Sequence, residues 1–84
     1  MKRLQRFKNK KALITGANGG IGSKLVESLK REGAIVAATD LDTSKIAADV
    51  NFDGDLKDSK FCDDLPKKVK KKLNGLDFLC NIAG

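Results

Sequence analysis

Three glycines near the amino terminus, Gly16, Gly20 and Gly22, have the spacing of a phosphate-binding loop. They follow an apolar run, residues 12–14, and precede a stretch with helical periodicity. A loop in this position points unpaired backbone N–H groups and the positive end of a helix dipole toward one place, which suits a phosphate. We expect Gly16 to permit the tight turn, Gly20 a close approach of the backbone to the ligand, and Gly22 close packing of the helix. An ordinary turn is the alternative, but the order of strand, loop and helix favours nucleotide binding.

The elements that position this loop alternate between strands and helices. Apolar runs predict strands over residues 10–15, 34–39, 50–53 and 76–81, and helical periodicity predicts helices over 20–32, 43–48 and 58–73. Gly33 is expected to cap the first helix in the left-handed conformation, and Pro66 either to begin a new helix or to kink a longer one. The alternation predicts the α/β class, a Rossmann-like doubly wound parallel sheet in partial form, with four strands in the order 3-2-1-4. The first two helices are expected to cover one face of this sheet and the third helix the other.

Composition argues against several other classes of protein. The 84 residues include two cysteines, Cys62 and Cys80, and no histidine, so we expect neither a metal site nor a disulfide framework. This use of cysteine predicts a cytoplasmic location. No run approaches the roughly 20 apolar residues of a membrane span. The net charge of +6 comes largely from basic residues in segments 1–11 and 67–72. Because the chain has no Tyr or Trp, we interpret the lysine run as a solvated helix face and expect no nucleic-acid partner.

Four motifs, in order along the chain, resemble the short-chain dehydrogenase/reductase family. Residues 15–22 (TGANGGIG) look like the TGxxxGxG cofactor loop, and Asp40 matches the acidic residue that selects NAD. Asp55 and Leu56 resemble the pair that lines the adenine pocket, and residues 81–84 (NIAG) are similar to the NNAG motif. The resemblance implies an oxidoreductase that binds a nicotinamide dinucleotide, with NAD preferred to NADP. The cofactor-binding residues that it implies are Gly16, Asn18, Gly19, Gly20, Ile21, Gly22, Asp40, Asp55, Leu56, Asn81, Ala83 and Gly84.

The sequence departs from the family pattern at two of these motifs. Ile82 stands where the second Asn of NNAG is expected. The loop also satisfies TGxxGxxG through Gly19, which is the spacing of the extended subfamily that includes sugar-nucleotide epimerases. The front half of an extended-type epimerase or dehydratase is therefore an alternative, although the step Gly20–Gly22 and the NIAG ending favour the classical type.

The family's catalytic residues are not present in this chain. In the family, a Ser and a Tyr-x-x-x-Lys follow NNAG, whereas this sequence ends at Gly84 and contains no Tyr. We therefore expect residues 1–84 to be the N-terminal part of a single NAD(P)-binding Rossmann domain that is inactive by itself. A small carbonyl or alcohol substrate would bind only with the missing half. A stand-alone nucleotide-binding or interaction module without turnover is the alternative. The fourth strand would be an exposed edge, which predicts self-association or pairing with a complementing chain.

Overall fold

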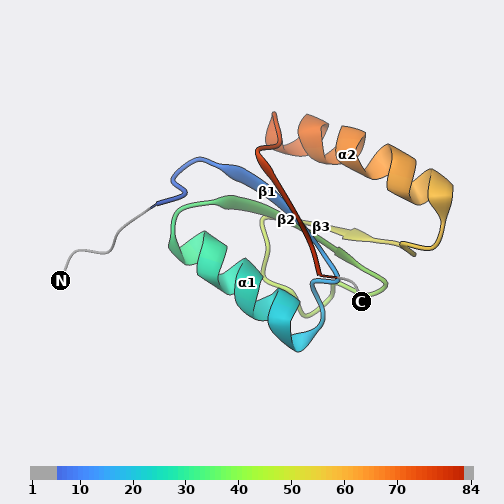
Figure 1. Ribbon diagram of the computed structural model, residues 1–84, viewed down its shortest axis with the longest axis horizontal. Helices are drawn as coiled ribbons and strands as arrows, with labels where there is room; N and C mark the ends of the chain where they lie inside the picture. The colour runs from blue at the N-terminus through green and yellow to red at the C-terminus, as the bar shows by residue number, and fades with distance from the viewer. Residues whose placement is uncertain (1–5, 83–84) are drawn as a thin grey trace.

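The computed structural model describes residues 6–82, which form a parallel sheet with one helix on each face (Figure 1). The elements in chain order are β1 (Lys11–Thr15), α1 (Gly20–Arg31), β2 (Ile35–Asp40), β3 (Val50–Asp53), α2 (Ser59–Leu73) and β4 (Phe78–Asn81). The four strands are parallel and lie in the order β3-β2-β1-β4, which confirms the predicted fold class and topology. Because the strands are parallel, their carboxyl ends meet at one edge of the sheet, next to the loop that joins β1 to α1.

Two apolar cores lie on opposite faces of the sheet. Neighbouring residues of β1 serve different cores, since Leu13 faces α2 and Ile14 faces α1. The residues of α2 that are buried against the sheet recur every four positions, as predicted, and are Leu65, Val69 and Leu73. The buried residues of α1 are Gly22, Val26 and Leu29. A strand that is covered on both faces requires an apolar residue at each position, which explains the continuous apolar run in β1.

Each helix has a capping residue at one of its ends. Gly33 follows α1 with φ +91°, and its N–H donates to the carbonyl of Lys30 at 3.0 Å, which confirms the predicted left-handed cap. At the start of α2, the carboxylate of Asp58 accepts from the N–H groups of Lys60 and Phe61. These caps satisfy backbone groups that have no partner inside the helices.

The prediction of a helix over residues 43–48 is wrong, because this segment is part of a non-helical connection from β2 to β3. The Nδ2 of Asn51 donates to the carbonyls of Thr43 and Ile46, at 3.1 and 3.0 Å. The Oδ1 of Asp53 accepts from the N–H of Thr43 at 2.9 Å and also from its hydroxyl. These side chains compete with helical hydrogen bonds for the backbone of a segment too short to form a stable helix alone. Within residues 6–82, this face of the sheet is therefore covered by one helix, α1, together with Ile46 of the non-helical connection, rather than by two helices.

The later part of the chain differs from expectation at two further places. α2 continues through Pro66, so of the two predicted outcomes the new helix is wrong and a single longer helix is found. The buried residues on both sides of Pro66 hold this helix against the sheet. β4 begins at Phe78, two residues later than predicted, because Asp77 bonds to Lys11 before the strand pairing starts. The Asp77 N–H donates to the Lys11 carbonyl at 2.7 Å, and its Oδ2 accepts from the Lys11 N–H at 2.8 Å.

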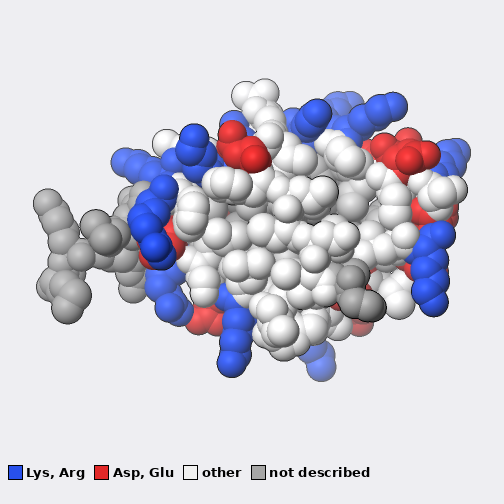
Figure 2. All heavy atoms as spheres, in the orientation of Figure 1, with Lys and Arg blue, Asp and Glu red and all other residues white. Residues whose placement is uncertain are grey.

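β4 is an edge strand, and no residue within 6–82 pairs with its outer side. It crosses the middle of the view in Figure 1, where Figure 2 shows an uncharged surface with both basic and acidic side chains around the rim. The side chain of Leu79 is 60% exposed, although its partner in the register, Leu13, is 1% exposed. On the α1 side, by contrast, Phe78 packs edge-to-face on Phe7 with ring centroids 5.5 Å apart. The bare apolar flank of β4 is therefore its α2 side.

Candidate functional site

A hollow of about 430 Å³ lies at the carboxyl edge of the sheet, between the glycine loop and the ends of β2 and β4. The residues that line it are Gly16, Gly19, Gly20, Ile21, Gly22, Asp40 and Ile82. Its volume lies within the roughly 300–1,000 Å³ of small-molecule sites. In doubly wound sheets, ligands bind at the carboxyl ends of the strands where the strand order reverses, which is here the position of β1. The hollow thus has the size and the location of a ligand site.

The conformation of the loop depends on glycine at two positions. Gly16 has φ +67°, a left-handed conformation that other residues rarely adopt. An ideal Cβ at Gly22 would lie 2.4 Å from the carbonyl oxygen of Gly16 and 2.8 Å from the Cα of Ala17. At Gly20, in contrast, a Cβ would meet no atom within 4 Å. Gly22 is therefore needed for packing of α1 against the loop, whereas Gly20 leaves open space beside the hollow.

The backbone N–H groups of the loop fall into two sets. Those of residues 17–19 donate within the protein, and their acceptors are the Thr39 carbonyl at 3.2 Å, the Asp40 Oδ2 at 2.9 Å and the Gly16 carbonyl at 3.3 Å. No described residue accepts from the N–H groups of residues 20–22, and Gly19 at the N-cap has no capping side chain. These three donors stand at the positive end of the α1 dipole, where a phosphate is stabilised.

Asp40 ends β2 with a half-buried side chain beside the glycine loop. Its Oδ2 accepts from the N–H of Asn18 at 2.9 Å, and its Oδ1 accepts from the N–H of Leu41 at 2.7 Å. A carboxylate has about four lone-pair positions, so it can accept further hydrogen bonds from ligand hydroxyl groups. The same negative charge disfavours a phosphate at close range.

Asn81 fastens the end of β4 to β1. Its Oδ1 accepts from the hydroxyl of Thr15 at 2.7 Å, and the next N–H, from Ile82, donates to the Thr15 carbonyl at 3.1 Å. These bonds bring the side chain of Ile82 to the wall of the hollow. Ile82 was expected only as a departure from the NNAG motif and not as a site residue. Its place directly after a strand that ends at this edge was the available signal.

The remaining predicted site residues lie elsewhere or outside the described range. Asp55 and Leu56 do not line the hollow. The Oδ1 of Asp55 accepts from the N–H of Lys57 at 2.9 Å, and Leu56 packs against the α2-side core. Ala83 and Gly84 lie outside residues 6–82. The structure therefore brings together the glycine loop, Asp40 and the end of β4, but not the predicted adenine pair.

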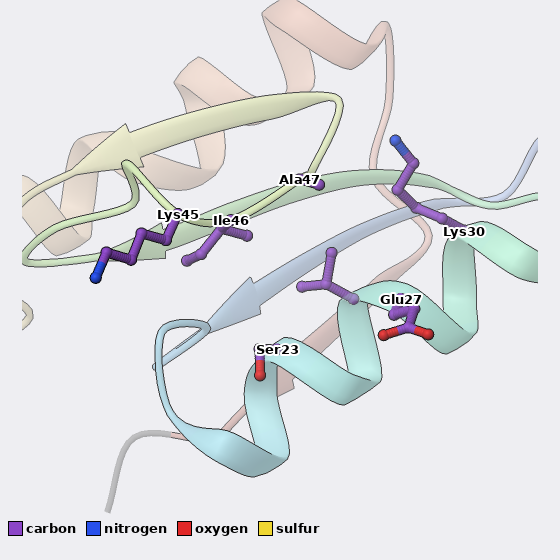
Figure 3. Close-up of a pocket in the computed structure, with 7 residues that line it drawn as sticks. Ser23, Glu27, Lys30, Lys45, Ile46 and Ala47 are labelled. Atoms are coloured by element: carbon purple, nitrogen blue, oxygen red, sulfur yellow. The ribbon is translucent and has the colours of Figure 1, made fainter.

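A second hollow, of about 520 Å³, runs along α1 beside the β2–β3 connection (Figure 3). Its residues are Ser23, Val26, Glu27 and Lys30 from α1 and Lys45, Ile46 and Ala47 from the connection. Lys30 pairs with Asp49 at 3.5 Å, and Glu27 pairs with Arg31 at 2.6 Å. Although it is larger, this hollow borders the body of α1, whose N–H groups are bonded within the helix. The smaller hollow at the N-terminus of α1 is therefore the better phosphate site.

Two further properties of the described residues bear on the kind of site. Within residues 6–82, no three His, Cys, Asp or Glu side chains lie close enough to hold a metal ion. Of the helices in this range, neither has the length and apolar character to cross a membrane.

Outside the hollow, the backbone N–H of Ser44 donates to Asp42 and, with the Ser44 hydroxyl, lowers the pKa of that carboxyl below its usual value.

Comparison with known proteins agrees with this geometry. The family model described as short chain dehydrogenase matches residues 10–84. The chain belongs to the short-chain dehydrogenase family. The "uncharacterized oxidoreductase YghA" of Escherichia coli is 38% identical to it, over 94% of this chain and 31% of the relative.

Two solved short-chain dehydrogenases, each 28% identical to this chain, share its fold. One, from Leptospira borgpetersenii with bound NAD⁺, has a TM-score of 0.83 and is matched over 100% of this chain and 35% of its own. The other, from Burkholderia cenocepacia in complex with NADP, has a TM-score of 0.84 and is matched over 94% of this chain and 37% of its own. Both dinucleotides thus occur among the structural relatives.

The chain spans about a third of the length of the curated short-chain dehydrogenases that it matches. It corresponds to the amino-terminal, nucleotide-binding portion of such an oxidoreductase, as the resemblance implied. The site described above lies entirely in this portion.

Proposed function

We propose that this chain binds a nicotinamide dinucleotide in the hollow at the glycine loop and that it prefers NAD to NADP. The observation that carries the proposal is the set of three backbone N–H groups, from Gly20, Ile21 and Gly22, for which no described residue is an acceptor. They stand at the positive end of α1, beside the carboxylate of Asp40. Related proteins that hold NAD⁺ or NADP support the choice of ligand.

The arrangement of the hollow suggests how its residues would hold the dinucleotide. The N–H groups of residues 20–22 would bind the pyrophosphate, and the open space at Gly20 lets it approach the backbone. Asp40 would accept hydrogen bonds from the hydroxyls of the adenosine ribose. The side chains of Ile21 and Ile82 would give the hollow apolar walls, and Asn81 would fix β4 beside them. These residues would hold a dinucleotide whose nicotinamide ring would supply the hydride-transfer chemistry.

The preference for NAD follows from the charge of Asp40. A 2′-phosphate about 4 Å from a carboxylate, at an effective dielectric constant of about 20, is disfavoured by about 4 kcal/mol before screening by salt. Asp40 is half-buried, so water and salt reduce this repulsion, but a fraction of it still dominates the selection. Residues 16–22 contain no basic side chain that could offset the repulsion.

We further infer that hydride transfer to a carbonyl, or from an alcohol, requires the rest of a longer polypeptide. A proton donor beside the substrate contributes about 10²- to 10⁴-fold to such a reaction, and this chain contains neither Tyr nor His. The outer edge of β4, with the exposed Leu79, would pair with that polypeptide or with a second copy of this chain. The free cysteines Cys62 and Cys80 support a cytoplasmic location.

Calorimetric titration of the purified chain with NAD and, separately, with NADP tests this function. We expect NAD to bind at least tenfold more tightly than NADP at low salt, and the ratio to fall as salt screens Asp40. Tighter binding of NADP would contradict the assigned preference. Failure of both dinucleotides to bind to the folded chain would contradict the proposed function itself.

A further inference from the structure

We infer that Asp40 is a positioning residue that holds the glycine loop in its binding conformation, in addition to its proposed contact with ribose. This inference deepens the proposed function and rests on it. Asp40 joins the end of β2 to two segments that are distant in the sequence, the glycine loop and the end of β3. Its Oδ2 accepts from Asn18 in the loop at 2.9 Å, its Oδ1 accepts from Leu41, and its carbonyl accepts from the N–H of Gly54 at 2.9 Å.

The bond from Asn18 differs from the other bonds that hold the loop. The N–H groups of Ala17 and Gly19 donate to neutral backbone carbonyls at 3.2 and 3.3 Å, whereas that of Asn18 donates to a carboxylate at a shorter distance. A hydrogen bond to an ionised acceptor is roughly twice as strong as one between neutral groups. Asn18 also lies two residues after Gly16, and a glycine, which has no Cβ, gives the neighbouring backbone more conformational freedom to lose. The bond to the carboxylate of Asp40 is therefore the strongest of the three hydrogen bonds that the N–H groups of residues 17–19 make.

This restraint affects the phosphate site because the loop leads directly into it. The bonded N–H groups end at Gly19, and the unbonded N–H groups begin at Gly20, in the first turn of α1. If the bond to Asn18 is lost, the loop gains alternative conformations, and the binding of a phosphate must then restore the ordered one. Loss of this bond would therefore lower the affinity for NAD and for NADP alike, because both would bind the loop through their pyrophosphate.

The two roles of Asp40 have opposite effects on NADP binding when the carboxylate is removed. Removal of the carboxylate relieves the repulsion of a 2′-phosphate, but it also loosens the loop that binds the pyrophosphate. We therefore expect Asp40→Ala to bind NAD more weakly than the unsubstituted chain does. Its affinity for NADP should rise by less than the loss of charge repulsion alone would predict. In Asp40→Asn, one carboxylate oxygen becomes an NH₂ group, which would face an N–H donor, so at least one of the two bonds to Asn18 and Leu41 is lost.

A ligand that cannot bond to Asp40 separates the two roles. The probe is NAD without the 2′- and 3′-hydroxyls of its adenosine ribose, titrated against the full chain and its variants. The matched control is Asp53→Ala, because Asp53 is the register partner of Asp40 at the end of β3 and accepts from Thr43, not from the glycine loop. We expect Asp40→Ala to weaken binding of the probe about tenfold and Asp53→Ala to change it less than threefold. Equal affinity of the probe for folded Asp40→Ala and for the unsubstituted chain would overturn the inference.

Hydrogen exchange without ligand gives a second, independent measurement. The Asn18 amide should exchange faster in Asp40→Ala, but not in Asp53→Ala. If Asp40→Ala does not fold by circular dichroism, Asp40→Val, which also has no acceptor atom and suits the end of a strand, is used for both measurements. Unchanged exchange at Asn18 in a folded Asp40 variant would overturn the positioning role. Failure of the unsubstituted chain to bind NAD would instead contradict the proposed function, while faster exchange at Asn18 would still support the role of Asp40 in the loop.

Discussion

The substitution Gly22→Ala tests directly whether the close contact between α1 and the loop organises the site. The added Cβ would lie 2.4 Å from the Gly16 carbonyl oxygen and 2.8 Å from the Ala17 Cα. Ordinary contacts between heavy atoms are about 3.5–4.0 Å, so α1 and the loop must separate by about 1 Å. Overpacking of this kind costs about 1–3 kcal/mol. Since each kcal/mol shifts the Tm of a domain of this size by about 4–8 °C, we expect a decrease of about 5–20 °C.

Gly20→Ala is the matched control, because its Cβ would meet no protein atom within 4 Å. We expect its free energy of unfolding to stay within about 0.5 kcal/mol of the unsubstituted chain. Its NAD affinity should nevertheless fall, since the added methyl group occupies space through which the phosphate approaches. Gly22→Ala should lose both stability and affinity. Thermal unfolding by circular dichroism, together with calorimetric titration of NAD, separates the two effects. A Gly22→Ala variant that melts and binds like the unsubstituted chain would refute the packing argument.

Three other predictions concern surfaces away from the loop. Substitution of three exposed lysines of α2, Lys67, Lys68 and Lys71, by glutamine should change the NAD affinity by no more than about threefold. If the variant instead loses most of its binding to polyanions at physiological salt, this face is a nucleic-acid surface. Leu79→Lys should shift the chain from dimers or aggregates toward monomers in sedimentation, because it places a charge on the open edge. A sharp monomer of the unsubstituted chain with cooperative unfolding would contradict this and favour a stand-alone module. Because Ser44 lowers the pKa of Asp42, the stabilisation from this contact is present above the usual pKa of 3.8 and is lost as the pH falls through the lowered pKa. A carboxyl pKa of 3.8 or above, measured by NMR for Asp42 in the folded chain, would contradict this.

The parts of the fold that depend on local patterns could be predicted from the sequence. The apolar run of β1, the glycines and the periodicity of α1 lie within one stretch, and each favours the same local structure. The order of the strands followed because alternating strands and helices strongly favour a parallel sheet. The stripe of Leu65, Val69 and Leu73 likewise required only the period of a helix.

The parts that depend on contacts between distant residues could not be predicted in this way. Residues 43–48 have no helix because Asn51 and Asp53, from the following strand, bond to Thr43 and Ile46. The bond between Asp40 and Asn18 joins residues that are 22 positions apart. Both contacts exist only once β2 and β3 have paired and β2 lies beside the loop. The sequence shows that these residues are polar and lie at the ends of strands, but it does not show which distant residues they bond to.

The most direct measurement of the central claim is the change in backbone amide NMR signals when NAD is added to the ¹⁵N-labelled chain. We expect the largest shifts at Gly20, Ile21 and Gly22, which have N–H groups without a described acceptor. We expect small shifts at Lys30 and Lys45, beside the larger hollow along α1. Shifts concentrated at the larger hollow, with the amides of residues 20–22 unchanged, would contradict the assignment of the glycine loop as the dinucleotide site.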